Sequence, residues 1–234
     1  MTLASLTVDQ LRIYPLFKDL DENELTRLAP LLTRRVLAKG AYLFYPGDPG
    51  ESIYLLKSGL VRLFFTNASG QEFLLNLVCP FEVIGLPMMD DDQVRVMGAA
   101  AHLPSVVLSI SKRDLFALMD ESPHLMRNVY REVSNNARKL LLHTRTLATV
   151  DLNGRLATLL LRLSRKGGNE ACTVAMPLTQ AELAGWLGAS RGRLNRAMIR
   201  LQQMGLICME EQKIMILDRP GLESLTEEPL SVNG

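Results

Sequence analysis

Residues 177–207 constrain the fold of this chain more than any other stretch, because they carry the local signals of two short helices joined by a tight turn. Thr179 precedes Glu182 by three positions, so each side chain can bond the other residue's free backbone amide in a capping box. Gly188 can adopt the left-handed conformation that ends this first helix, and Ser190 can cap a second one. We therefore predict a helix, a turn and a helix here.

The second predicted helix has one apolar and one basic face. The apolar stripe recurs at three- and four-residue spacing and is expected to pack on a core; it consists of Leu194, Ala197, Met198 and Leu201. No acidic residue occurs between positions 190 and 204. Arginine and asparagine match base edges in the DNA major groove, so the pattern favours a DNA-reading helix-turn-helix over the alternative of a solvated cationic face. The expected DNA contacts are Thr179, Gln180, Ser190, Arg191, Gly192, Arg193, Asn195, Arg196 and Arg200.

A β-hairpin is expected after the second helix. Gly205 is placed to end that helix, and apolar runs follow at residues 206–209 and 213–217, separated by polar residues. This arrangement predicts a wing beside the helix-turn-helix.

Composition excludes several classes of protein. The chain has 234 residues, of which 47% are hydrophobic, which is enough for two domains with separate cores. No apolar run is long enough to span a membrane and no signal sequence is recognisable, so we expect a cytoplasmic protein without membrane contact. The three cysteines lie far apart, which suggests neither a disulfide framework nor a metal site.

The texture of residues 34–110 is that of a β domain. Short β-rich runs alternate with Gly, Pro, Asn and Asp turn signals, which predicts an antiparallel sandwich or jelly roll with a hollow large enough for a small ligand. Residues 8–32 predict short helices packed on this roll, and the run Asp90, Asp91 and Asp92 predicts a solvated turn.

Residues 122–150 predict one long helix. Two seven-residue series, offset by three positions, form a seam that is typical of a parallel dimer; in the alternative interpretation the helix lies on its own β domain. The expected dimer interface consists of Met126, Val129, Val133, Asn136, Leu140, His143, Leu147 and Val150.

The predicted fold class is α+β, with three segments in order. Residues 1–121 form an N-terminal effector-sensing jelly roll, residues 122–150 the dimerisation helix, and residues 151–234 a winged helix-turn-helix domain. Asp151 can cap the first helix of the last segment, and the hinge is expected at Lys166, Gly167 and Gly168.

This order resembles the Crp/Fnr family of bacterial transcription regulators across nearly the whole chain. The resemblance is carried by KGAYLFYPGD, IYLLKSGLVRLFF, DLNGRLATLL and LTQAELAGWLGASRGRLNR. It implies a homodimer that binds a palindromic site on double-stranded DNA, with RNA polymerase as a further partner. Arg191 and Arg196 match residues with which family members read the major groove. Gly192 stands where many members have Glu, which implies a half-site different from that of the cyclic-AMP receptor.

The pocket departs from the family pattern. Members that bind cyclic AMP use a Gly-Glu pair, an Arg-Ser pair and a Thr-Ser pair, and this chain has Gly85-Leu86, Arg95-Val96 and Leu140-Leu141 at those positions. Only the arginine is kept, which argues against ordinary cyclic-AMP sensing. We expect an organic effector or anion near Arg95, although a structural salt bridge of Arg95 is an alternative. The expected effector pocket consists of Gly85, Leu86, Arg95, Val96, Leu140, Leu141 and His143.

The cofactor is left unknown by the sequence. Without an N-terminal group of cysteines an iron–sulfur cluster is not expected, whereas His102, His124 and His143 leave haem ligation open. A regulator without any small effector is a second hypothesis. A metal-dependent jelly-roll enzyme would need a His cluster, and His102 is alone in the predicted roll, so we expect no catalytic residues and no metal site.

Overall fold

The computed structural model describes residues 7–67, 70, 72–86, 94–166, 173–175, 179–210 and 213–226. The chain divides into two compact units, Met1–Arg138 and Lys139–Gly234, so the division falls inside the long helix α4 (Pro123–Thr149). The predicted hinge glycines Gly167 and Gly168 and the acidic run 90–92 lie outside the described residues.

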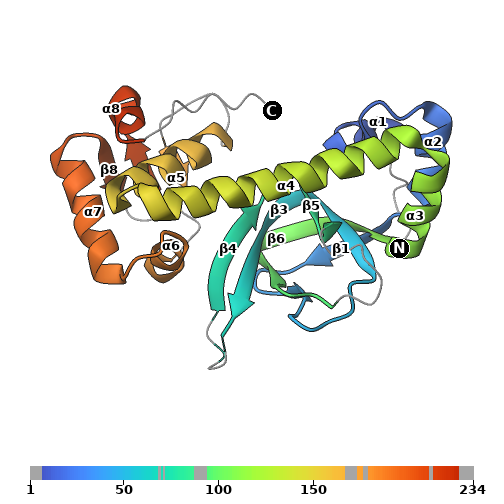
Figure 1. The fold of residues 1–234 in the computed structure, drawn as a ribbon, viewed down its shortest axis with the longest axis horizontal. Coiled ribbons are helices and arrows are strands. Elements are labelled where there is room, and N and C mark those ends of the chain that lie inside the picture. The colour runs from blue at the N-terminus through green and yellow to red at the C-terminus, as the bar shows by residue number, and fades with distance from the viewer. Residues whose placement is uncertain are drawn as a thin grey trace. The chain divides into compact units, whose positions relative to one another are not determined.

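The predicted α+β fold class is confirmed, and Figure 1 shows its elements in both units. In chain order they are α1 (Val8–Arg12), η1 (Pro15–Phe17), α2 (Glu22–Leu28), η2 (Ala29–Leu31), β1 (Thr33–Leu37), β2 (Tyr42–Phe44), β3 (Ser52–Thr66), β4 (Glu72–Val78), β5 (Val83–Ile84), β6 (Gly98–Ser111), α3 (Lys112–Glu121), α4 (Pro123–Thr149), α5 (Leu152–Lys166), β7 (Thr173–Ala175), α6 (Gln180–Trp186), α7 (Arg191–Gln203), β8 (Ile207–Glu210), β9 (Lys213–Ile216) and α8 (Arg219–Ser224).

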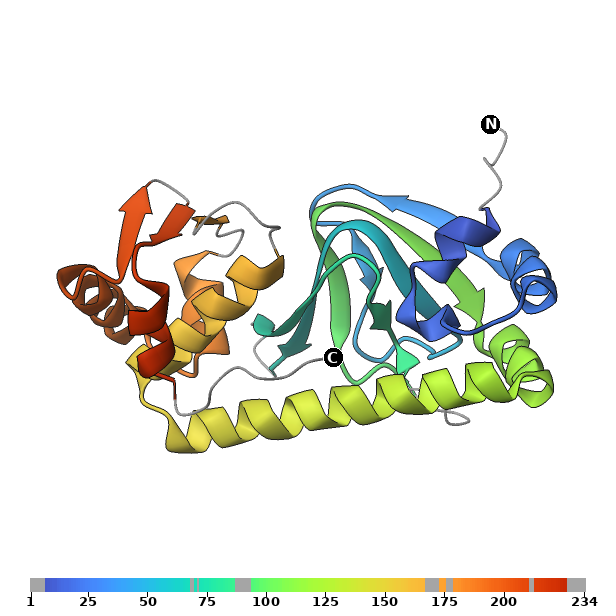
Figure 2. The same ribbon diagram turned by 90° about the horizontal axis from the view of Figure 1, so that it is seen from above.

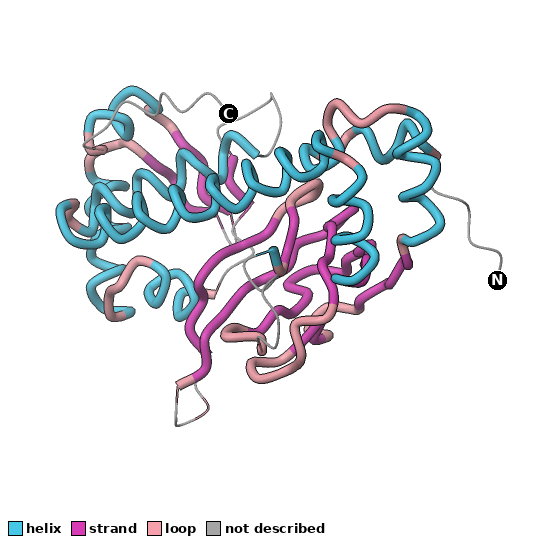
Figure 3. Tube along the Cα trace, turned by 45° about the vertical axis from the view of Figure 1, so that its right-hand side comes forward, coloured by secondary structure: helices cyan, strands magenta, loops and turns pink. Residues whose placement is uncertain are grey.

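The N-terminal unit is built on one antiparallel sheet in the order β1-β6-β3-β4, with β2 on β6 and β5 on β3. Figure 3 shows the strands in magenta and the helices in cyan. Side chains on β3 alternate between two cores, as the pleat of a strand requires. Ile53 and Leu55 pack in the core shared with the helices, whereas Tyr54 and Leu56 pack in the core inside the roll.

In the N-terminal unit a capping box fixes the start of α2, and one buried amide attaches α4 to the helices before the sheet. Asp21 forms a capping box with Glu24 at the start of α2. On α4, the buried Asn128 donates its side-chain amide to the carbonyl oxygens of Leu16 and Lys18, at 3.2 and 2.6 Å. These bonds attach the first turns of α4 to the N-terminal helices.

The C-terminal unit packs α5, α6 and α7 around leucines, beside the antiparallel sheet β7-β9-β8. Asp151 accepts a 2.8 Å hydrogen bond from the Gly154 amide, so the predicted cap of α5 is confirmed. The predicted wing is also present as the pair β8 and β9, and Figure 2 shows this hairpin beside α7.

The faces of α4 correct one prediction. Val129 is 5% exposed and belongs to the core of the N-terminal unit, so it does not lie on the exposed face with Met126 and Val133. The exposed apolar series is Met126, Tyr130, Val133, Leu140, Leu141 and Leu147. Val129 is therefore not available to a dimer interface, whereas the other members of its predicted series, Asn136, His143 and Val150, are half-buried.

Candidate DNA-reading face and buried arginine

The helix α7 is held in place by its cap and by its buried stripe. The Ser190 hydroxyl accepts a hydrogen bond of 3.3 Å from the Arg193 amide, and Gly188, with a φ of 62°, forms the turn before it. The predicted stripe is buried as expected, at Leu194, Ala197, Met198 and Leu201. A Cβ on Gly188 would lie 3.3 Å from Leu147 and from Arg155, so the turn packs closely on α4 and α5.

The opposite face of α7 is exposed and cationic. Every predicted contact on this helix is exposed: Arg191, Gly192, Arg193, Asn195, Arg196 and Arg200. Within the described ranges, none of the four guanidinium groups is engaged in an ion pair, so their donors are available to an anionic partner. A face of this kind suits phosphates and guanine edges.

At the start of α6, the predicted DNA contacts Thr179 and Gln180 differ in whether their side chains are already hydrogen-bonded. The Thr179 hydroxyl and amide both donate to the Glu182 carboxylate at 2.8 Å, and the Glu182 amide donates back to the hydroxyl at 3.2 Å. This capping box engages the Thr179 side chain. Gln180 is exposed at the first turn and keeps its side chain for a partner.

The N-terminal unit contains a buried arginine, Arg95. Its side chain is 2% exposed and lies over the ring of Phe44, with the guanidinium carbon 4.4 Å from the ring centroid. The Tyr54 ring is 5.8 Å away. One terminal nitrogen donates to the carbonyl oxygen of Ser52, whereas Nε and the other terminal nitrogen have no partner among the described residues.

The surroundings of Arg95 explain its position, and none of the described residues forms an ion pair with it. Burial lowers the pKa of the guanidinium, and Tyr54 and Asp48 act in the opposite direction. The Asp48 carboxylate accepts the Tyr45 amide at 2.7 Å, and no ion pair between Asp48 and Arg95 is formed. Gly85 has a φ of 99°, and a Cβ there would come within 2.6 Å of the Arg95 side chain. Glycine is therefore required beside the arginine.

The other residues of the predicted pocket are distributed differently. Leu86 is buried in the core beneath the helices, away from the aromatic rings that hold Arg95, and Val96 is 55% exposed. Leu140 and Leu141 belong to the C-terminal unit and are 54% and 72% exposed. His143, in the same unit, stacks on Trp186 with the ring centroids 5.9 Å apart.

The three histidines are not gathered at one place. His102 is in β6, whereas His124 and His143 are both on α4, in its first turn and near its C-terminal end, where His143 stacks on Trp186 of α6. In the part of the chain that the structure describes, no group of three or more His, Cys, Asp or Glu residues is arranged to hold a metal ion.

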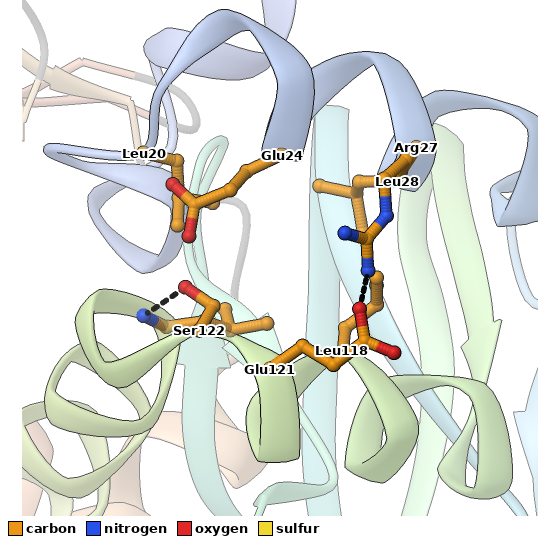
Figure 4. Close-up of a pocket in the computed structure, with 8 residues that line it drawn as sticks. Leu20, Glu24, Arg27, Leu28, Leu118, Glu121 and Ser122 are labelled. Carbon is orange, nitrogen blue, oxygen red and sulfur yellow. Dashed lines mark hydrogen bonds and ion pairs between the residues drawn. The ribbon is translucent and has the colours of Figure 1, made fainter.

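A surface pocket of the N-terminal unit already has its polar groups engaged. It lies between α2 and the junction of α3 with α4. Figure 4 shows Arg27 reaching across it to form an ion pair with Glu121. Glu24 accepts the Asp21 amide and Ser122 accepts the amide of Leu125. This pocket therefore offers a ligand less than the unpaired nitrogens of Arg95 do.

Sequence patterns did not identify three residues that the structure places at these sites. Phe44 and Tyr54 lie beside the Arg95 guanidinium. Nothing in the sequence round these two residues indicated that they share a partner. Ile199 is 43% exposed on the reading side of α7. Its signal was present in the sequence, as an apolar residue outside the buried stripe.

The β-roll, the long helix and the winged helix-turn-helix together define a class of DNA-binding regulators with a ligand-binding type of N-terminal domain. Residues 34–122 match the cyclic nucleotide-binding domain family, and residues 154–225 match the Crp-like helix-turn-helix domain family. The cyclic AMP receptor protein of Thermus thermophilus is 30% identical over 214 residues, covering 90% of this chain and 96% of that protein. The transcriptional activator protein anr of Pseudomonas aeruginosa is 31% identical, covering 79% of this chain and 76% of that protein.

The chain belongs to the Crp/Fnr family of transcription regulators, and is a DNA-binding regulator rather than an enzyme. Among solved structures, the catabolite activator protein of Thermus thermophilus is 29% identical with a TM-score of 0.51, over 90% of this chain and 97% of that one. FixK2 from Bradyrhizobium japonicum shares the fold at 20% identity, with a TM-score of 0.76 over 85% of this chain and 98% of that one. Within the described residues, no helix has the length and apolar character needed to cross a membrane.

Proposed function

We propose that this protein is a homodimeric, sequence-specific regulator that acts in the cytoplasm and whose DNA affinity is controlled by an anionic effector other than cyclic AMP, bound at Arg95. Two features of the chain support the proposal together. One is the buried Arg95 guanidinium, with two nitrogens that have no partner among the described residues, and the other is the exposed cationic face of α7 in a DNA-binding family. Each needs a negatively charged partner, and the two partners differ in size and access.

The effector half of the proposal rests on the cost of burial. A buried cation without a counter-charge is unfavourable by several kcal/mol, on the order of the penalties known for unpaired buried ions. An anion that accepts from Nε and the free terminal nitrogen of Arg95 would offset that cost. The side chain of Leu86, which follows Gly85, is packed in a separate core and carries no acceptor for a ribose hydroxyl. This favours an effector other than cyclic AMP.

The dimer half rests on the exposed apolar series of α4. Met126, Val133, Leu140 and Leu147 recur every seven residues with exposed fractions between 37% and 54%. A second copy of the same helix would cover this seam, as in a parallel coiled coil. Two reading helices would then meet successive major grooves about 34 Å apart, on a palindromic operator.

Contacts inside the C-terminal unit supply a route for regulation. The last turns of α4 pack on the helix-turn-helix, through the stack of His143 on Trp186 and the closeness of Leu147 to Gly188. A change in the dimer seam would therefore move α6 and α7. A coupling of about 1 to 3 kcal/mol would change DNA affinity about 5- to 150-fold.

Operator selection from random DNA, followed by fluorescence anisotropy, tests the proposal. We expect a palindromic operator that differs from the cyclic-AMP-receptor site, and an affinity that millimolar cyclic AMP leaves unchanged. An increase in affinity with micromolar cyclic AMP would contradict it.

The dimer is tested by Leu140→Glu, with Asn135→Glu as the matched control. Asn135 is exposed and lies about 140° round the helix from Leu140. We expect Leu140→Glu to be monomeric by light scattering and to bind the operator weakly, and Asn135→Glu to remain dimeric. A monomeric wild-type protein that binds the palindrome fully would contradict the proposal.

One observation favours a second function, that of a regulator without a small effector. Arg95 is already held by the Phe44 ring and the Ser52 carbonyl, so its role can be to brace the roll. In that case Arg95→Met destabilises the fold and changes no ligand response.

A further inference from the structure

An isoleucine lies in the middle of the cationic face of α7. Ile199 is 43% exposed and is separate from the buried stripe that includes Met198 and Leu201. It follows Gly192 by seven residues, so at about 100° per residue the two lie within about 20° of each other round the helix. Its neighbours on this face, Asn195 and Arg196, are exposed and polar.

The spacing of this face is that of a base-reading helix. Gly192, Asn195, Arg196 and Ile199 occupy positions i, i+3, i+4 and i+7, the spacing with which a homeodomain recognition helix contacts base edges. The four positions span about 10 Å of helix, close to three base-pair steps. Gly192 has open space round it and adds no bulk between the helix and a base. Ile199 therefore lies within the length of helix that can face bases.

The chemistry of the side chain narrows its target. Isoleucine has no donor or acceptor for a phosphate or for a polar base edge. In the major groove, the 5-methyl group of thymine is the apolar group that a base pair presents, and apolar side chains contact it. We propose that Ile199 is a specificity-determining residue that packs on a thymine methyl group in each half-site. This inference rests on the proposed DNA-reading function of α7.

A matched control separates base reading from ordinary surface exposure. Met204 is 49% exposed at the C-terminal cap of α7, and at about 100° per residue it lies about 140° round the helix from Ile199. It offers a similar apolar area away from the reading face. Both positions are exposed, so truncation at either leaves the core intact.

The test uses the selected operator with each thymine replaced in turn by deoxyuridine, which removes only the methyl group. We expect the wild-type protein to lose about fourfold in affinity per half-site at one thymine position, the effect of burying one methyl group. Ile199→Ala should bind the thymine and uracil operators equally at that position. Met204→Ala should keep the wild-type discrimination.

Two outcomes would overturn the inference while leaving the proposed function intact. One is a wild-type protein that binds every uracil-substituted operator as tightly as the parent operator. The other is an Ile199→Ala protein that discriminates between thymine and uracil as the wild type does. Failure of the proposed function has a different signature, since no operator is then selected and Arg196→Ala binds DNA as the wild type does.

Discussion

Two sites in this molecule use arginine in opposite surroundings. Arg95 is 2% exposed, over the Phe44 ring and beside a glycine. The arginines of α7 are exposed on one side of a helix whose other side forms the core. Water solvates the second group at no cost, whereas the first lost its hydration when the roll folded. A long anionic polymer can reach only the exposed site, and a small anion gains most at the buried one.

The difference also predicts how each site responds to salt. Exposed charges act through counterion release and are screened within about 10 Å at 0.1 M salt, so DNA binding should weaken steeply as salt is raised. A ligand inside the roll is screened much less. The two binding events can therefore be separated by ionic strength alone.

The largest effect is expected from Arg196→Ala on the reading face. Removing a groove contact should weaken operator binding by about 1 to 3 kcal/mol per half-site, because a bidentate pair with guanine is lost. Anisotropy with the selected operator measures it. Arg113→Ala is the control, since that side chain is 92% exposed on α3 in the other unit. Equal affinities for the two variants would break the distinction between the reading face and general surface charge.

At the buried site, Arg95→Met should abolish stabilisation by the effector. The same substitution should raise the free energy of unfolding by about 1 to 2 kcal/mol, because an unpaired buried cation is replaced by an apolar side chain. Chemical denaturation measures this free energy. The matched control is Arg62→Met in the same roll, where the arginine lies over Phe64 and is paired with Glu72. That variant should be less stable than the wild type. A similar loss of stability in Arg95→Met would identify Arg95 as a structural residue.

Among the described residues, Tyr14 also has a buried polar atom without a hydrogen-bond partner, but unlike Arg95 it carries no charge at neutral pH. Its hydroxyl has no hydrogen-bond partner among the described residues, and burial raises its pKa to about 12. The folded state binds this proton more tightly than the unfolded state. The resulting contribution to the free energy of unfolding is therefore fully present below pH 10 and is lost as the pH rises from 10 to 12. The loss should approach about 2 kcal/mol. In Tyr14→Phe, the free energy of unfolding measured by chemical denaturation should fall less between pH 10 and pH 12 than in the wild type. An equal fall in both proteins would show that burial of the Tyr14 hydroxyl does not cause it.

The smallest effect is expected at Gly192, the one reading-face position without a side chain. A Cβ there meets nothing within 4 Å, so Gly192→Ala should stabilise α7 by about 0.5 to 1 kcal/mol. Gly185→Ala in α6 has equally open surroundings and should give a similar gain. Thermal denaturation compares the two, and only Gly192→Ala should alter the operator preferred in selection. Identical preferences would remove Gly192 from the reading face.

Local signals predicted the C-terminal unit well because caps and turns act over a few residues. Thr179 with Glu182, Ser190 and Asp151 cap helices as expected, and Gly188 adopts a positive φ. The burial stripe of α7 followed from the helical period alone. These features depend on no distant part of the chain.

Tertiary arrangement decided what the sequence left open. Whether Val129 lies on the exposed face of α4 depends on which side of the helix the N-terminal core covers, and Val129 is part of that core. Likewise Leu86 follows Gly85 in sequence but packs in a different core from the rings round Arg95. The environment of Arg95 could not be predicted, because it is formed by Phe44, Tyr54 and Ser52, which lie far from Arg95 in sequence.

In the proposed mechanism, a small anion held by Arg95 changes how tightly α7 binds DNA. The decisive experiment measures operator affinity with and without a small-molecule extract of the organism that encodes the protein, for the wild type and Arg95→Met. We expect the affinity to change by at least about fivefold for the wild type, not to change for Arg95→Met, and not to change for either protein with cyclic AMP. An unchanged wild-type affinity, or an equal change in both proteins, would contradict the proposed mechanism.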